Sequence, residues 1–138
     1  MVLNNFSKTV DLIHRSLDAE TVRRETIANN MANAEVPNFK RSEVNFESSL
    51  LRALESENQR PAVEMTVRDP RHLSNVQVLD YQDVRPRRVL DYLTQSKPNG
   101  NNVDPDKEFQ LLVENQMKYM LLTQSASYEF KQVNSVLR

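Results

Sequence analysis

Few residues in this sequence have the types and spacing that catalysis requires. Histidine occurs only at positions 14 and 72. His14 lies at helical spacing from Asp11 and Asp18, which could form a carboxylate–imidazole pair. No nucleophile or third polar group accompanies that pair, and His72 lies in a predicted turn. We therefore interpret His14 as part of a polar helix face, and the sequence predicts no catalytic residue and no enzyme.

The composition also argues against cofactor and metal sites. The chain has no cysteine and a single glycine, Gly100, which excludes thiolate ligands and glycine-rich phosphate loops. A metal site would need more ligands than this chain groups together. We expect no cofactor and no metal.

Charge and hydropathy argue against nucleic acid and membrane partners. The formal net charge of 138 residues is −1. The basic run at residues 85–88 is flanked by Asp80, Asp83 and Asp91, so we interpret it as a solvated, self-neutralising segment. No apolar run approaches the roughly 18 residues that span a membrane, and the N-terminus lacks the pattern of a cleavable secretory signal. We expect no nucleic acid binding and no direct membrane insertion.

Apolar residues near the N-terminus follow a heptad repeat. Positions alternately three and four residues apart are mostly apolar from residue 3 to residue 34, which places them on one stripe of a helix. We predict a helix from residue 4 or 5 to about residue 35, because Pro37 disfavours helical geometry at Val36. Asn38 follows where a left-handed turn residue is tolerated. The predicted seam residues are Phe6, Val10, Ile13, Leu17, Ile27 and Met31.

A second heptad repeat closes the chain. Asp104 is a good N-cap and Pro105 is favoured at the first helical position, so we predict a helix over residues 104–137. Its predicted seam residues are Phe109, Leu112, Tyr119, Phe130 and Val133. Residues 119–122 cover most of the helix circumference, so they belong either to a local core under the middle segment or to contacts with other subunits. The candidate subunit contacts are Met117, Met120, Leu121 and Leu122.

The middle of the chain has weaker signals. Phe46, Leu50, Leu51 and Leu54 have the spacing of a short helix. Prolines interrupt residues 61–92, where short apolar runs at 62–67, 76–79 and 89–93 indicate about two short strands, and residues 94–103 read as a loop. The sequence thus predicts a mainly α fold in which two long terminal helices pair as an antiparallel coiled coil. The predicted segments are 1–41, 42–103 and 104–138, and the two terminal segments form one domain.

Three asparagines, Asn29, Asn30 and Asn33, lie near the end of the first predicted helix, where asparagine is unfavourable. They are compatible with a solvated polar face, but their amides could also bond a neighbouring backbone or one another across an interface. The stretch IANNMANAEVPNFKR resembles the N-terminal motif of bacterial flagellar axial proteins, the rod and hook family. The resemblance implies an assembly motif comprising Asn29, Asn30, Asn33, Pro37, Asn38 and Phe39.

The second half of the resemblance lies at the start of the C-terminal helix. Residues 100–124, GNNVDPDKEFQLLVENQMKYMLLTQ, are similar to the C-terminal signature of proximal rod proteins of the FlgB type. Pro105 stands where that pattern more often has an apolar residue, a change that a helix start tolerates.

The resemblance implies a structural subunit of the proximal rod of the flagellar basal body, polymerising into a tubular drive shaft. It further implies type III export without a cleaved signal, assembly in the periplasm, and contacts with other rod proteins, the rod–ring adaptor, the membrane (MS) ring and copies of itself. On the sequence alone, a soluble coiled-coil adaptor or export chaperone forming a discrete dimer remains the alternative.

Overall fold

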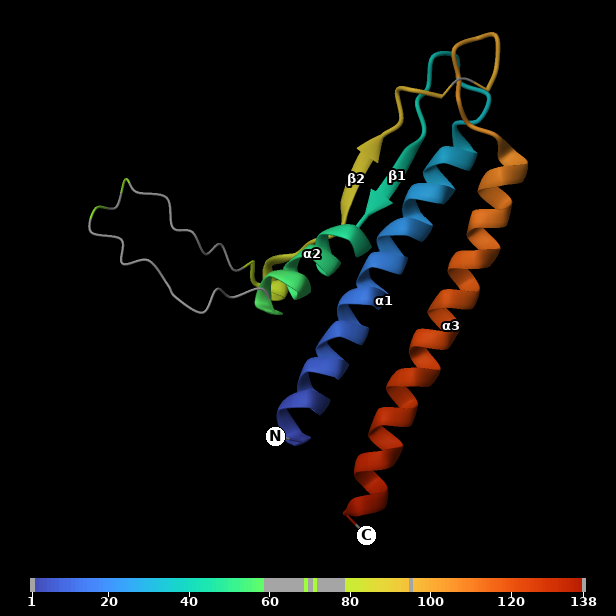
Figure 1. Ribbon diagram of the computed structural model, residues 1–138. Coiled ribbons are helices and arrows are strands. Elements are labelled where there is room, and N and C mark those ends of the chain that lie inside the picture. The colour runs from blue at the N-terminus through green and yellow to red at the C-terminus, as the bar shows by residue number, and fades with distance from the viewer. Residues whose placement is uncertain (1, 59–68, 70, 72–78, 95, 138) are drawn as a thin grey trace. The chain divides into compact units, whose positions relative to one another are not determined.

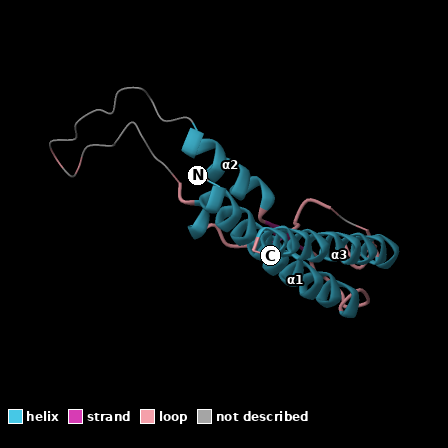
Figure 2. Ribbon diagram, turned by 90° about the horizontal axis from the view of Figure 1, so that it is seen from below, coloured by secondary structure: helices cyan, strands magenta, loops and turns pink. Residues whose placement is uncertain are grey.

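The computed structural model describes residues 2–58, 69, 71, 79–94 and 96–137 (Figure 1). The chain divides into two compact units, Met1–Val44 with Arg88–Arg138, and Asn45–Arg87. Helices make up most of the regular structure (Figure 2). The elements in order are α1 (Val2–Ala32), β1 (Ser42–Asn45), α2 (Glu47–Asn58), a 3-10 helix η1 (Tyr81–Asp83), β2 (Arg87–Leu90) and α3 (Pro105–Val136).

The first unit is built on an antiparallel pairing of α1 and α3, whose chain ends lie at the same end of the hairpin (Figure 1). Near those ends the rings of Phe6 and Phe130 meet edge to face, with centroids 5.9 Å apart. This arrangement confirms the predicted mainly α fold with paired terminal helices. Both helices lie within three residues of their predicted bounds.

Local capping explains where the helices begin and end. The Asp104 side chain accepts a hydrogen bond from the backbone N–H of Asp106 at 3.1 Å, and Pro105 occupies the first turn, as predicted. Beyond α1, Asn38 has φ of 60°, which confirms the predicted left-handed turn. Asparagine tolerates this conformation better than other residues with a Cβ atom.

The buried residues of α3 are only partly the residues that were predicted to form its seam. Glu108 and Asn115 are buried, whereas Phe109 is 58% exposed. The buried and half-buried positions that form the seam of α3 are 108, 111, 112, 115, 122, 126, 129 and 133. The predicted positions 112 and 133 are among them, whereas Tyr119 is 45% exposed and Phe130 is 49% exposed. The prediction of Phe109 as a seam residue was wrong. Hydrogen bonds allow the polar side chains of Glu108 and Asn115 to be buried, whereas the apolar pattern alone favoured Phe109 over Glu108. Leu122, proposed as a subunit contact, is half-buried on this seam.

On α1 the predicted seam is closer to the observed one. Ile27 is buried, and the following predicted residues are half-buried: Phe6, Val10, Ile13, Leu17 and Met31. Glu20, a polar residue at one position of the heptad repeat, is buried as well.

A two-stranded ribbon of β1 and β2 completes the first unit. The Arg88 guanidinium of β2 contacts the Glu25 carboxylate of α1 at 2.7 Å. No pattern in the sequence predicted β1, and β2 overlaps the apolar run predicted at residues 89–93. The candidate strand at 62–67 and most of that at 76–79 lie outside the described residues.

The second unit contains α2 and η1. α2 confirms the short helix predicted from Phe46 to Leu54, and Phe46 and Ala53 are buried. The Ser56 hydroxyl accepts from the Leu79 backbone N–H at 3.0 Å. Asp80 caps η1 by accepting from the Gln82 N–H.

Candidate assembly interface

Two kinds of site are absent from the described residues. Within them, no group of three histidine, cysteine or acidic side chains could hold a metal ion. No helix in the described part of the chain is long and apolar enough to cross a membrane. His14 is exposed on α1, and His72 lies outside the described residues.

Asn30 joins α1 to the ribbon through both atoms of its amide. Its Oδ1 accepts from the Ser42 backbone N–H at 3.0 Å, and its Nδ2 donates to the Ser42 carbonyl at 2.9 Å. The same Nδ2 lies 3.2 Å from Oε2 of Glu108. Asn30 is therefore buried, which corrects the interpretation of a solvated polar face at this position. The alternative expectation, an amide bonded to neighbouring backbone, describes it correctly.

A buried ion pair connects the start of the ribbon to the start of α3. Arg41 Nε donates to Glu108 Oε1 at 3.0 Å, and both side chains are almost completely buried. Glu43 and Asp91 also lie within ion-pair distance of Arg41. The Thr94 hydroxyl lowers the pKa of the Asp91 carboxyl, with smaller contributions from backbone N–H groups and Arg41. No local sequence pattern predicts this role for Arg41 or Glu108, because the two residues are 67 positions apart in the chain.

Two asparagines of the loop before α3 hold the end of α1 and the start of β1. Asn101 Nδ2 donates to the carbonyls of Asn33, Ala34 and Val36 at 2.8–3.0 Å. Asn102 Oδ1 accepts from the Arg41 N–H at 2.6 Å, and its Nδ2 donates to the Asp91 carbonyl at 2.7 Å. These bonds satisfy carbonyls that a helix end leaves without intrahelical partners. The two asparagine-rich motifs of the sequence thus meet at one end of the hairpin.

The turn at Asn38 fits against Gly100. The Asn38 N–H donates to the Asn99 carbonyl at 3.1 Å, and Lys40 Nζ donates to the Gly100 carbonyl at 2.8 Å. Gly100 has φ of 79°, and a Cβ atom at this position would lie 2.6 Å from Asn38 Oδ1. Both the backbone conformation and the close approach therefore require glycine at this position.

Replacement of Gly100 by alanine should destabilise the first unit. We expect a loss of about 1–2 kcal/mol from the left-handed backbone, and more from the contact with Asn38. Adding Asn38→Gly should restore part of the loss, because it removes the clashing atom and leaves the backbone strain. Chemical denaturation measures both effects, with Ser96→Ala in the same loop as the control. An unchanged midpoint for Gly100→Ala would mean that the loop does not hold this conformation.

The other residues of the implied assembly motif are more exposed. Asn29 and Pro37 are exposed, and Phe39 is half-buried. The half-buried Asn33, which directly follows α1, donates its side-chain amide to the Asn29 carbonyl at 2.8 Å. Asn29, Pro37 and Phe39 are thus at least partly accessible at the end of the hairpin where the two asparagine-rich motifs meet, which we call the motif end. The Asn30 side chain is instead buried in contacts inside the chain.

One polar pair interrupts the middle of the seam. Asn115 Nδ2 donates to the Glu20 carbonyl at 2.9 Å and to the Glu20 carboxylate. Arg23 also donates to that carboxylate. These groups lie on the facing sides of α1 and α3. Glu20, the polar residue in the heptad repeat of α1, is therefore hydrogen-bonded to Asn115 of the opposite helix.

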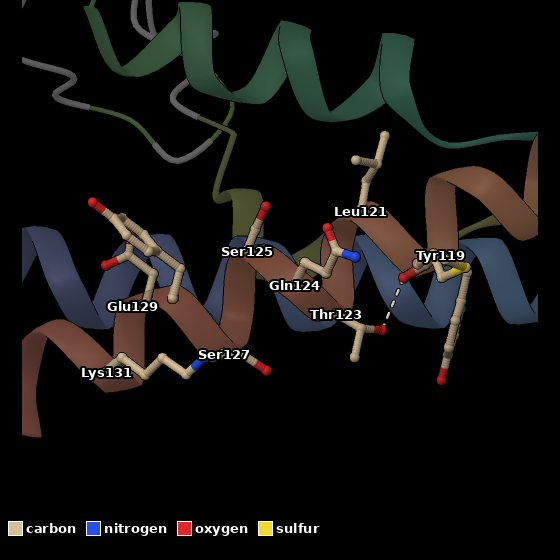
Figure 3. Close-up of a pocket in the computed structure, with 10 residues that line it drawn as sticks. Tyr119, Leu121, Thr123, Gln124, Ser125, Ser127, Glu129 and Lys131 are labelled. Carbon is tan, nitrogen blue, oxygen red and sulfur yellow. Dashed lines mark hydrogen bonds between the residues drawn. The ribbon is translucent and has the colours of Figure 1, made fainter.

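The side of α3 opposite the seam is apolar and exposed. At about 100° per residue, its large side chains lie together on one face. Met117 and Leu121 are 61% and 62% exposed. Figure 3 shows Leu121 and Tyr119 pointing away from each other on α3, and the hollow along residues 119–131 is lined by this helix alone. We call this face the outer stripe; it comprises Phe109, Val113, Met117, Met120, Leu121 and Tyr128.

A second set of exposed apolar residues follows in sequence along β2 and the segment after it. Leu93 is 98% exposed, which is unusual for so large an apolar side chain. We call this set the ribbon patch; it comprises Val89, Leu90, Tyr92 and Leu93. Groups of exposed apolar residues are typical of surfaces that bind other proteins. The sequence predicts subunit contacts at Met117, Met120 and Leu121 of the outer stripe, whereas residues 89–93 were predicted as a strand and not as a contact surface.

Comparison with known proteins extends over nearly the whole chain. No family model matches the sequence. The chain is 43% identical over 136 residues to the flagellar basal body rod protein FlgB of Borreliella burgdorferi, covering 99% of this chain and 100% of that protein. It is 44% identical over 137 residues to FlgB of Borrelia hermsii, with 99% and 100% covered. It is 31% identical over 134 residues to FlgB of Bacillus subtilis, with 96% and 95% covered. The chain, with its paired terminal helices and exposed apolar face, belongs to the FlgB family of flagellar basal body rod proteins.

Proposed function

We propose that this protein is a structural subunit of the proximal rod of the bacterial flagellar basal body. It polymerises with other rod subunits into the tubular drive shaft that transmits torque from the membrane ring to the distal rod and hook. The observation that carries this proposal, beyond family membership, is the outer stripe of α3. A long helix with apolar surface on two opposite sides requires a partner on each side, and α1 supplies only one of them.

Two different apolar surfaces suit a polymer. The outer stripe lies on α3 opposite the seam. The ribbon patch lies on β2 and the residues after it, and Arg88 of β2 forms an ion pair with Glu25 of α1. Contacts between unlike surfaces generate rings or open helical arrays. Because packed helices at interior density transmit strain, such an array resists twisting without any catalytic step.

The proposal includes the partners and location that the rod assignment implies. The partners are other rod proteins, the rod–ring adaptor, the MS ring and further copies of this chain. The location is the periplasmic part of the basal body, reached through the flagellar type III export apparatus without a cleaved signal peptide. Asn29, Pro37 and Phe39 at the motif end are available for such contacts.

Isolation of basal bodies tests the assignment directly. A strain lacking the gene should be non-motile, and the tagged protein should restore swimming and co-purify with basal bodies. Immunogold labelling should place it on the rod between the MS ring and the distal rod. Full motility without the protein, or its recovery only in the soluble fraction, would favour the adaptor or export chaperone instead.

Amide hydrogen exchange should differ between free and assembled subunits. In dilute solution, α1 and α3 have uncovered apolar surface, so we expect frayed helices and fast exchange over residues 5–32 and 106–136. In isolated rods the same amides should exchange slowly, because neighbouring subunits stabilise the ordered state. Strong protection of both helices in a verified monomer would contradict this coupling.

A further inference from the structure

The outer stripe of α3 has a partial internal symmetry in its sequence. Its first charged residue is Asp106 and its last is Lys131, and the positions between them on this face carry no charge. Phe109 lies three residues inside the acidic end, and Tyr128 lies three residues inside the basic end. The polar residues Gln110 and Ser127 occupy the next pair of matching positions. The stripe therefore matches in these pairs when it is read from either end, with charges of opposite sign at its two ends. Two further pairs differ in kind, because Val113 corresponds to Gln124 and Leu121 to Gln116.

A stripe of this kind complements a second copy of itself in the antiparallel orientation. Asp106 of one copy would then lie opposite Lys131 of the other, and Phe109 opposite Tyr128. Met117 would meet Met120 close to the twofold axis. Aromatic pairs and adaptable methionines suit such a contact. A parallel pairing would instead place like charges opposite each other at both ends.

We propose that free subunits associate through the outer stripe as an antiparallel, twofold-symmetric dimer, in which α3 packs against α3 of a second copy. This inference rests on the proposed rod function, because it concerns the subunit before assembly. The two copies of a twofold dimer point in opposite directions, whereas the subunits of a rod share one direction along its axis. The dimer is therefore incompatible with the rod. Because both use the outer stripe, the dimer must dissociate before a subunit is incorporated.

The size of the stripe sets the strength of this contact. From Phe109 to Tyr128 it extends about 28 Å, and with a width of about 10 Å it covers on the order of 300 Å². Stable interfaces bury about 800 Å² on each partner. The dimer should therefore be weak and concentration-dependent, which allows rod contacts to displace it.

Cysteine crosslinking tests the orientation, because the natural chain has no cysteine. Gln110→Cys and Ser127→Cys are each expected to remain uncrosslinked alone and to form a disulfide dimer when the two variants are mixed. Ser125→Cys, at another exposed serine that lies off the stripe, should not crosslink with Gln110→Cys. Crosslinking of Gln110→Cys with itself would indicate a parallel pair and overturn the proposal.

Charge reversal gives a second, non-covalent readout. Asp106→Lys should weaken self-association in sedimentation equilibrium by about three- to tenfold, because it places lysines opposite each other at both ends. Adding Lys131→Asp should restore association, whereas Lys107→Glu, off the stripe, should change it little. Absence of association by folded protein at millimolar concentration, or absence of rescue, would overturn the dimer. Either result leaves the rod assignment intact, since recovery of the protein from basal bodies tests that assignment separately.

Discussion

Replacement of Ile27 by aspartate is expected to prevent the first unit from folding and to abolish swimming. Ile27 is 4% exposed on the side of α1 that faces α3. A carboxylate buried there without a cation costs several kcal/mol, a large part of the 5–15 kcal/mol that stabilises a typical domain. Circular dichroism of the purified protein and swimming of complemented cells measure the two outcomes.

The adjacent residue provides a matched control. Ala28 is exposed on the same turn of α1, so Ala28→Asp introduces the same charge at a cost of roughly 0.7 kcal/mol in helix propensity. Ile27→Val should likewise cost only about 0.5–1.5 kcal/mol. Equal loss of helix from Ile27→Asp and Ala28→Asp would show that α1 does not bury this face.

The second large effect is expected at the ion pair between the ribbon and α3. Arg41→Met leaves the buried Glu108 carboxylate with the Asn30 amide as its one side-chain partner among the described residues, and we expect a loss of about 3–5 kcal/mol. Denaturation at a fixed protein concentration measures the change in the free energy of unfolding. Arg88→Met, which breaks an exposed ion pair with Glu25, should cost no more than about 1 kcal/mol.

A double substitution separates the ion pair from its surroundings. Arg41→Met with Glu108→Leu removes both charges and should recover much of the lost stability, because apolar residues can replace a buried ion pair. If the double variant is no more stable than Arg41→Met alone, the contacts of Arg41 with Glu43 and Asp91 contribute more than the contact with Glu108.

Local signals in the sequence were sufficient for the long helices. Asp104 and Pro105 mark the start of α3, and Pro37 follows the end of α1, because caps and breakers act within a few residues. The heptad repeats also predict the pairing, since each stripe needs an apolar partner. A short helix in the middle segment follows from the same periodicity.

Long-range polar contacts could not be predicted in this way. Glu108 and Asn115 are polar, and their burial depends on Asn30, Arg41 and Glu20, which lie 67–95 residues away in the chain. Apolar periodicity alone therefore selected Phe109 in place of Glu108. The strand β1 was missed for a related reason, because its backbone is held by the Asn30 amide and by β2 rather than by its own four residues.

The polar pair of Glu20 and Asn115 has a mechanical consequence for a subunit under load. Heptad packing repeats every seven residues, so two helices joined by apolar contacts alone could slide past each other by one repeat, about 10 Å, and pack again. Such a slide would separate Asn115 from Glu20 and Asn30 from Glu108, leaving buried amides and carboxylates without partners. These two polar contacts, at different positions along the helices, therefore oppose sliding of α1 along α3. A subunit that is twisted together with its neighbours would keep its length.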